Sequence, residues 1–174
     1  MIVISDTSPV LSLARIGRLE ILRTLYSEVL IPNAVYEELR AATRPPAEID
    51  FAAIPWLTVT SATDQRRVAE LCSELDLGEA EAIALALERH ADLLLVDERK
   101  ARRTAAASGL TVTGLIGVVA QAKRVGAIDE AKPHVALRLH GSGSVRWSSP
   151  AVRPAVAATR RPRRSTVGRR TRMC

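Results

Sequence analysis

Four acidic residues of the 174-residue chain stand where their carboxylates could serve one reaction. Asp6 and Asp97 each follow directly on a short apolar run, and Glu38 and Glu81 lie in intervening segments with helical spacing. A hard divalent cation prefers oxygen ligands, and Mg²⁺ keeps several waters while taking one or two carboxylates directly. Because such a site needs acids that converge from distant parts of the chain, the pattern indicates metal-assisted hydrolysis of phosphodiesters.

Each of these acids also has a simpler interpretation. Asp6 and Asp97 lie between a strand and a helix, where an aspartate often caps the helix. Glu38 stands beside Glu37 and suits a solvated helix face. The joint occurrence favours a shared site, because one acid follows the first strand, one follows a late strand and others lie on two helices between them.

The choice between Glu79 and Glu81 depends on helix geometry. Residues two apart on an α-helix are about 200° apart, so only one of the two is expected to face the site. The segment from Asp76 to Glu79 resembles a capping box, which already accounts for Glu79. We therefore predict Glu81 as the ligand, although composition alone does not distinguish the two.

Other hydrolytic chemistries are disfavoured. The three histidines, His90, His134 and His140, lie at a predicted helix end or near the C-terminus, and no serine stands in a nucleophile-elbow motif. A phosphatase that forms an aspartyl phosphate would need a second acid two positions after Asp6, where this sequence has Ser8.

Alternating apolar segments predict the elements that must hold the acids. Ser8 is predicted to cap the first helix, with Pro9 as its first residue. Strands are predicted at 1–5, 29–31, 57–60, 93–96 and 110–113, and later helices at 19–26, 33–42, 64–75, 79–90, 98–108 and 115–124.

Buried strands separated by helices indicate an α/β fold, with a parallel sheet of four or five strands sandwiched between helices. In such sheets, ligands bind beyond the carboxyl ends of the strands, where the strand order reverses. Asp6 and Asp97 each follow a strand, so both are expected at that crevice.

The formal net charge of +6 is unevenly distributed. Residues 1–132 hold all 19 acidic and 15 of the 25 basic residues, a net charge of −4, whereas residues 133–174 hold ten arginines and no acid. An acidic body that handles RNA needs cations between its carboxylates and the phosphates, which is how a metal-dependent nuclease works.

The sequence also bears on the cellular compartment. Cys72 and Cys174 lack metal-ligand spacing, and a secreted fold of this size would seldom rely on one possible disulfide. Cys72 is predicted to be a small buried hydrophobe. No apolar run approaches the roughly 20 residues that span a bilayer, so we expect a soluble, cytoplasmic protein without membrane contact.

Four ordered blocks resemble the PIN domain: IVISDTSPVLSLA at 2–14, LIPNAVYEEL at 30–39, LGEAEAIALA at 77–86 and DLLLVDE at 92–98. They are closest to a branch often described as predicted nucleic-acid-binding proteins, similar to the virulence-associated (VapC-type) toxin ribonucleases of toxin–antitoxin operons. The resemblance covers about residues 1–130. Ser8 stands where toxins commonly have Asn, and Leu95-Val96 replaces a Thr-x pattern.

The resemblance implies a metal-dependent endoribonuclease. It places Asp6, Glu38, Glu81 and Asp97 as ligands of Mg²⁺ or Mn²⁺, with RNA as substrate, and it suggests a homodimer and a cognate antitoxin. The alternative is a catalytically inactive PIN-fold module that binds RNA or a protein.

The resemblance divides the chain into a PIN-like nuclease domain, 1–132, and a tail, 133–174. The tail has no acids, few aliphatic residues and neither helical nor strand periodicity, so we predict that it is disordered. Its arginine-rich composition suggests a frameshift product, and the other interpretation is a genuine basic arm that adds phosphate contacts.

Overall fold

The computed structural model describes residues 1–42 and 49–128, all of which belong to one compact unit, 1–140. The predictions for the tail at 133–174, namely its disorder, its domain boundary and its origin, fall on residues outside the described part of the chain.

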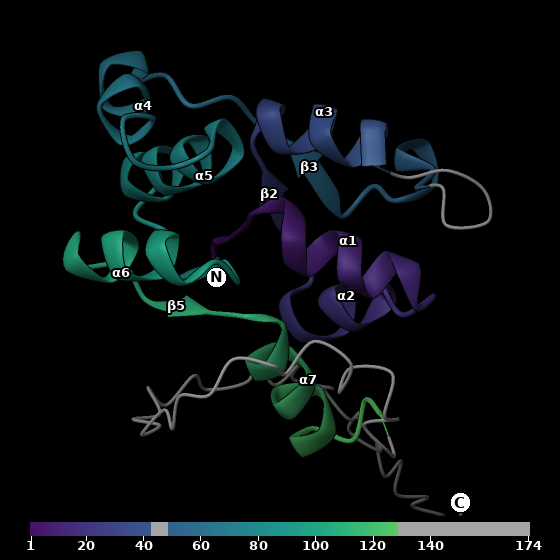
Figure 1. Ribbon diagram of the computed structural model, residues 1–174. Coiled ribbons are helices and arrows are strands. Elements are labelled where there is room, and N and C mark those ends of the chain that lie inside the picture. Colours follow the sequence, from purple (N-terminus) through teal and green to yellow (C-terminus); the bar gives the residue numbers. More distant parts are fainter. Residues whose placement is uncertain (43–48, 129–174) are drawn as a thin grey trace, which may run out of the picture. The chain divides into compact units, whose positions relative to one another are not determined.

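Five short strands form a single parallel sheet, which confirms the predicted α/β class (Figure 1). Their lateral order is β3-β2-β1-β4-β5, so β3 and β5 lie at the edges. The chain moves outward from β1 through β2 to β3, then returns to the other side of β1 for β4 and β5. The strands are β1 Val3–Ser5, β2 Val29–Ile31, β3 Leu57–Val59, β4 Leu93–Leu95 and β5 Val112–Thr113.

Helices connect the strands throughout the described residues, as the apolar periodicity predicts. They are α1 Thr7–Arg15, α2 Glu20–Tyr26, α3 Asn33–Ala42, α4 Gln65–Leu71, α5 Leu77–Glu88, α6 Arg99–Ala107 and α7 Leu115–Arg124, with a 3₁₀ turn at Phe51–Ala53.

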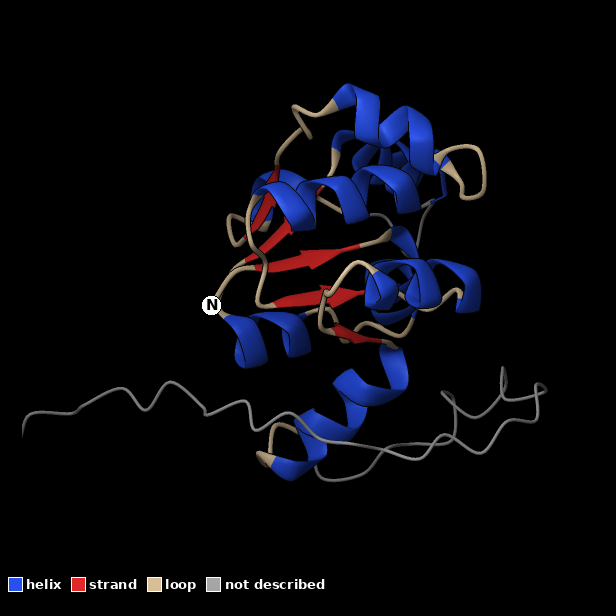
Figure 2. Cartoon of the chain, turned by 90° about the vertical axis from the view of Figure 1, so that its left-hand side faces the viewer, coloured by secondary structure: helices blue, strands red, loops and turns tan. Residues whose placement is uncertain are grey.

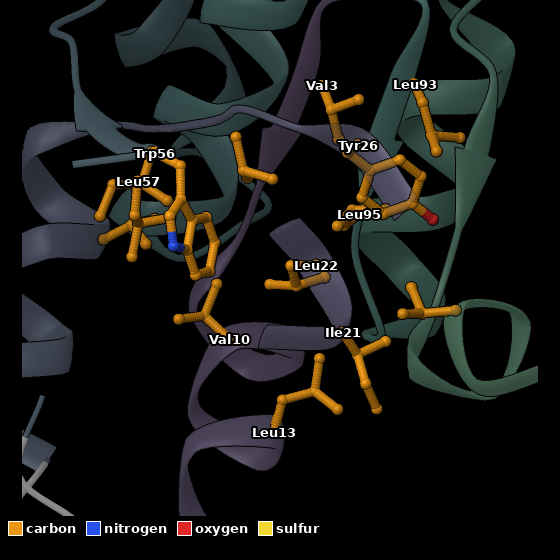
Figure 3. Packing of buried hydrophobic residues seen from close by; sticks show 14 of the residues in the cluster. Val3, Val10, Leu13, Ile21, Leu22, Tyr26, Trp56, Leu57, Leu93 and Leu95 are labelled. Carbon is orange, nitrogen blue, oxygen red and sulfur yellow. The ribbon is translucent and has the colours of Figure 1, made fainter. Parts of the chain in front are cut away.

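Both faces of the sheet are covered by helices (Figure 2). Successive strand residues point to opposite faces, so Val3 and Leu95 pack in one hydrophobic cluster with α1, α2, α3 and α7 (Figure 3). Ile4 and Leu94 pack in a second cluster with α4, α5 and α6. Burial on both sides explains why these strands lack polar alternation.

Three local predictions are wrong. Asp6, not Ser8, is the N-cap of α1, and its side chain accepts a hydrogen bond from the Ser8 amide. α4 ends at Leu71, four residues earlier than predicted, and its C-cap Cys72 is exposed, not buried. Nothing in the periodicity indicated the 3₁₀ turn.

Among the residues that the structure describes, no helix is long and apolar enough to cross a membrane.

Candidate metal centre

The sheet topology brings Asp6 and Asp97 to the same place. β1 and β4 are neighbours, with Ser5 in register with Leu95, and the Asp6 amide donates to the Leu95 carbonyl at 2.9 Å. Asp6 follows β1 directly, and Asp97 lies two residues after the end of β4. Both acids therefore follow neighbouring strands at the point where the strand order reverses.

Asp6 is both a helix cap and a buried acid. It is only 4% exposed, and its Oδ2 accepts from the Ser8 amide at 3.5 Å. Burial, together with the negative charges of Glu38 and Asp97, raises the pKa of Asp6 to about 6, against the opposing effect of the Thr7 and Ser8 amides. Asp6 is therefore a carboxylate whose charge the metal-free protein does not balance.

Glu38 projects from α3 to the N-terminal end of α5. The Thr7 hydroxyl donates to Glu38 Oε2 at 2.5 Å. A Cβ atom placed on Gly78 would lie 2.6 Å from Glu38 Oε1. Glycine at this position leaves the space that the Glu38 carboxylate occupies.

Asp97 has a similar arrangement at the start of α7. Its Oδ1 accepts from the Leu115 amide at 2.8 Å, in the first turn of α7, and a Cβ atom on Gly114 would collide with the same oxygen. Burial raises the pKa of Asp97, whereas the Leu115 amide and the positive charge of Arg102 lower it. The prediction that Asp97 caps the helix that follows it is wrong, because Glu98 is the N-cap of α6 and Asp97 accepts from the first turn of α7 instead.

Glu79 and Glu81 take different places on α5. Glu79 closes a capping box, accepting from the Asp76 amide at 3.4 Å, and its pKa is raised first by burial and then by the charge of Asp6. Glu81 is 9% exposed, and its Oε2 accepts from the Ala34 amide in the first turn of α3 at 2.8 Å. The structure therefore brings Glu79 into the electrostatic surroundings of Asp6 and joins Glu81 to α3.

We call the acids that share the surroundings of Asp6 the acidic cluster. Its members are Asp6, Glu38, Glu79 and Asp97. The sequence predicted three of these acids as ligands but not Glu79. Its role in the capping box was taken to exclude a role as a metal ligand. A usable signal was Gly78, which marks a close approach to the first turn of α5.

The cluster offers the ligands that a hard divalent ion prefers. All of its donors are carboxylate oxygens, and acids that repel one another are stabilised by a cation. Asp6 is buried, Glu79 and Asp97 are half-buried and Glu38 is exposed. Within the described residues, no three His, Cys, Asp or Glu side chains already form a ligand set, since Glu38 and Asp97 are turned toward chain donors. The residues fit a metal ion on condition that these side chains reorient.

Comparison with known proteins identifies the fold. The model of the DUF3368 family, described as a PIN domain, matches residues 2–158. A solved PilT N-terminus domain protein from the hyperthermophilic archaeon Sulfolobus solfataricus is similar, with a TM-score of 0.50 and 19% identity over 70% of this chain and 92% of that chain. At this identity the similarity shows the fold alone. No curated protein matches the chain.

Proposed function

The chain belongs to the PIN-domain family, and on this premise we propose that it is a metal-dependent endoribonuclease that hydrolyses RNA phosphodiester bonds. PIN domains are generally nucleases, and they generally use divalent metal ions. The observation that carries the proposal is the position of Asp6. This acid is buried at the point where the strand order reverses, with a raised pKa and three other acids near it.

In this proposal the acidic cluster holds Mg²⁺ or Mn²⁺, with Asp6 as its central carboxylate. A bound divalent ion supplies an activated water and stabilises charge on the phosphate and the departing oxygen. The Thr7 hydroxyl holds one Glu38 oxygen and leaves the other open beside Gly78. The reaction requires no covalent intermediate with the protein.

Glu79 takes the place of Glu81 as the fourth ligand in this proposal, because the negative charge of Asp6 acts on Glu79. Glu81 accepts from the Ala34 amide and so links α5 to α3. We propose that Glu81 acts through the fold, because it joins α5 to the helix that carries Glu38.

The resemblance to VapC-type toxins supports a narrower form of the proposal. In that form the protein is the toxin of a toxin–antitoxin pair, acts in the cytoplasm as a homodimer and is inhibited by a cognate antitoxin. The altered Ser8 and Leu95-Val96 positions bear on substrate choice, and the target within RNA stays open.

One observation favours a second candidate, a PIN-fold module that binds RNA or a protein without cutting it. Glu38 and Asp97 already accept hydrogen bonds from Thr7 and Leu115, and a metal ion must compete with these donors. If the contacts are too strong to exchange, the site stays closed to metal.

Cleavage of RNA separates the two candidates. Purified protein is incubated with mixed structured and single-stranded RNA and Mn²⁺, alongside an EDTA control and the Asp6→Asn variant. The nuclease proposal predicts that EDTA abolishes RNA cleavage. It also predicts that Asp6→Asn lowers the cleavage rate at least about 100-fold, because the Asp6 carboxylate is the main ligand of the ion. Equal cleavage by Asp6→Asn would contradict it. RNA that is bound but never cut would establish the binding module.

A further inference from the structure

Helix α6 is the most strongly basic element among the described residues, and it begins beside the acidic cluster. Its first five residues include Arg99, Lys100, Arg102 and Arg103, and no acid lies within the helix. Its buried residues are Ala101 and Ala105, both 0% exposed. Alanines four residues apart form one face of a helix, so the basic side chains point away from the core.

Most of these positive charges have no counter-ion in the protein. Lys100 pairs with Glu74 on another element, at 3.8 Å. In the part of the chain that the structure describes, no carboxylate lies within 4.0 Å of the guanidinium groups of Arg99, Arg102 and Arg103. Arg99 and Arg103 are exposed and Arg102 is half-buried.

Arg102 lies in the first turn of α6, close in sequence to Asp97. Glu98 caps α6, and the Arg102 amide donates to the Glu98 carbonyl at 3.0 Å, one turn later. Helical side chains lean toward the N-terminus and cover the preceding turn, which here begins next to Asp97. Consistent with this position, Arg102 is half-buried and its charge acts on Asp97.

A phosphate group that approaches the acidic cluster meets repulsion from every carboxylate that the metal does not neutralise. Guanidinium groups offset such repulsion, because they stay charged and bind phosphate through two parallel hydrogen bonds. The positive charge of Arg102 lowers the pKa of Asp97, and no other cation of the described residues contributes to the pKa shifts of Asp6, Glu79 and Asp97.

We propose that the start of α6 is the phosphate-binding element of this protein, with Arg102 contacting the phosphate that is cut. Arg99 and Arg103 bind neighbouring phosphates of the same RNA strand. This inference rests on the proposed nuclease function, and it names the residues that hold the substrate, whereas the acidic cluster holds the metal.

The test compares Arg102→Gln, Arg102→Lys and the double variant Arg99→Gln/Arg103→Gln with Lys100→Gln, a matched loss of one charge from the same helix. A fluorescent single-stranded RNA oligonucleotide is the substrate, with Mn²⁺, and Mn²⁺ binding is measured separately by calorimetry. Arg102→Gln is expected to lower kcat about 100-fold while Mn²⁺ affinity is kept, as for loss of one transition-state donor. Arg102→Lys keeps the positive charge but not the bidentate geometry, so its kcat should lie between that of wild type and that of Arg102→Gln.

The outer arginines should affect binding instead. The double variant is expected to raise KM with kcat unchanged, and to reduce the slope of log affinity against log salt by about 1.4, as for two lost contacts to a single strand. Lys100→Gln should match wild type within about twofold, because surface ion pairs contribute little.

Equal kcat and KM for Arg102→Gln and Lys100→Gln would overturn the inference, as would loss of Mn²⁺ binding together with activity in Arg102→Gln. If the wild-type protein cuts no RNA, the nuclease proposal fails instead. The fluorescence anisotropy of the same oligonucleotide then tests phosphate binding by α6 separately. Weaker RNA binding by the three arginine variants than by Lys100→Gln would still support the phosphate-binding role of α6.

Discussion

Glu79 and Glu81 are separated by one residue of α5, yet their carboxylates have opposite electrostatic surroundings. Glu79 lies near Asp6, whose negative charge raises its pKa. Glu81 accepts a hydrogen bond from the Ala34 amide, at the N-terminal end of α3, where a helix favours negative charge. Both acids accept from a backbone amide, Glu79 within its own helix and Glu81 across to α3, but the charge of Asp6 acts on Glu79.

This difference separates acids that serve the fold from acids that serve the site. A buried carboxylate that accepts from a backbone amide stabilises the protein without any ion. Carboxylates that face one another destabilise the metal-free protein until a proton or a cation offsets their repulsion. Glu81 still matters to the site, because Glu38 lies one turn after Ala34 on the helix that Glu81 anchors.

The largest expected effect on stability comes from removing the Glu81 carboxylate, which accepts from the Ala34 amide. Glu81→Leu keeps a similar side-chain volume but leaves the half-buried Ala34 amide without its acceptor, so the free energy of unfolding should fall by about 1 to 2 kcal/mol. Urea unfolding in the presence of EDTA measures this loss.

Two variants sharpen the comparison. Glu81→Gln keeps an oxygen that can accept from Ala34 and should recover most of the loss. Glu79→Gln removes a repelling charge and should leave the metal-free protein as stable as wild type or slightly more so. The two faces of α5 would not differ as described if Glu79→Gln were as harmful as Glu81→Leu.

A smaller effect follows from the pKa of Asp6. This pKa is about 6 in the folded protein and 3.8 as a reference for the unfolded chain, so the folded state holds the proton more tightly. The resulting stability is fully present below pH 3.8 and is lost as the pH rises through 6. With about 1.4 kcal/mol for each pKa unit, metal-free protein should be about 1.5 kcal/mol less stable at pH 7.5 than at pH 5.

The pH window is chosen to isolate the acidic cluster. The raised pKa values of Glu79 and Asp97 act in the same direction as that of Asp6. Hydrogen bonds from Thr63 and Asp64 lower the pKa of Glu88, and its opposite contribution is confined to pH values below its ordinary pKa of 4.5. Asp6→Asn should remove most of the dependence in chemical unfolding at the two pH values, and an unchanged dependence would exclude Asp6 as its source.

Much of the fold could be predicted from local patterns. β4 is apolar at every position and β1 at every position except Ser5, and both strands are buried throughout because both faces of the sheet are covered. The start of α1 could not be fixed, since Asp6 and Ser8 are both good N-caps and Pro9 is acceptable in the first turn after either one. The end of β1, set by pairing with β4, decides between them.

The site was predictable only where an acid follows a strand. Asp6 and Asp97 meet because parallel strands end at one edge of a sheet. The phase of α5 shows that Glu79 and Glu81 point apart, but not which of them faces that edge. That depends on how α3 packs against α5, a contact between segments far apart in sequence.

The most direct test of the account is a calorimetric titration of Mn²⁺ into metal-free protein, comparing Asp6→Asn, Glu79→Gln and Glu81→Gln with wild type. If the acidic cluster is the metal site and Glu81 is an anchor, wild type and Glu81→Gln should bind Mn²⁺ with affinities within about threefold of each other. Asp6→Asn and Glu79→Gln should each bind at least about tenfold more weakly, as for removal of a direct ligand. Binding that survives in Glu79→Gln and disappears in Glu81→Gln would contradict the account and return Glu81 to the ligand set.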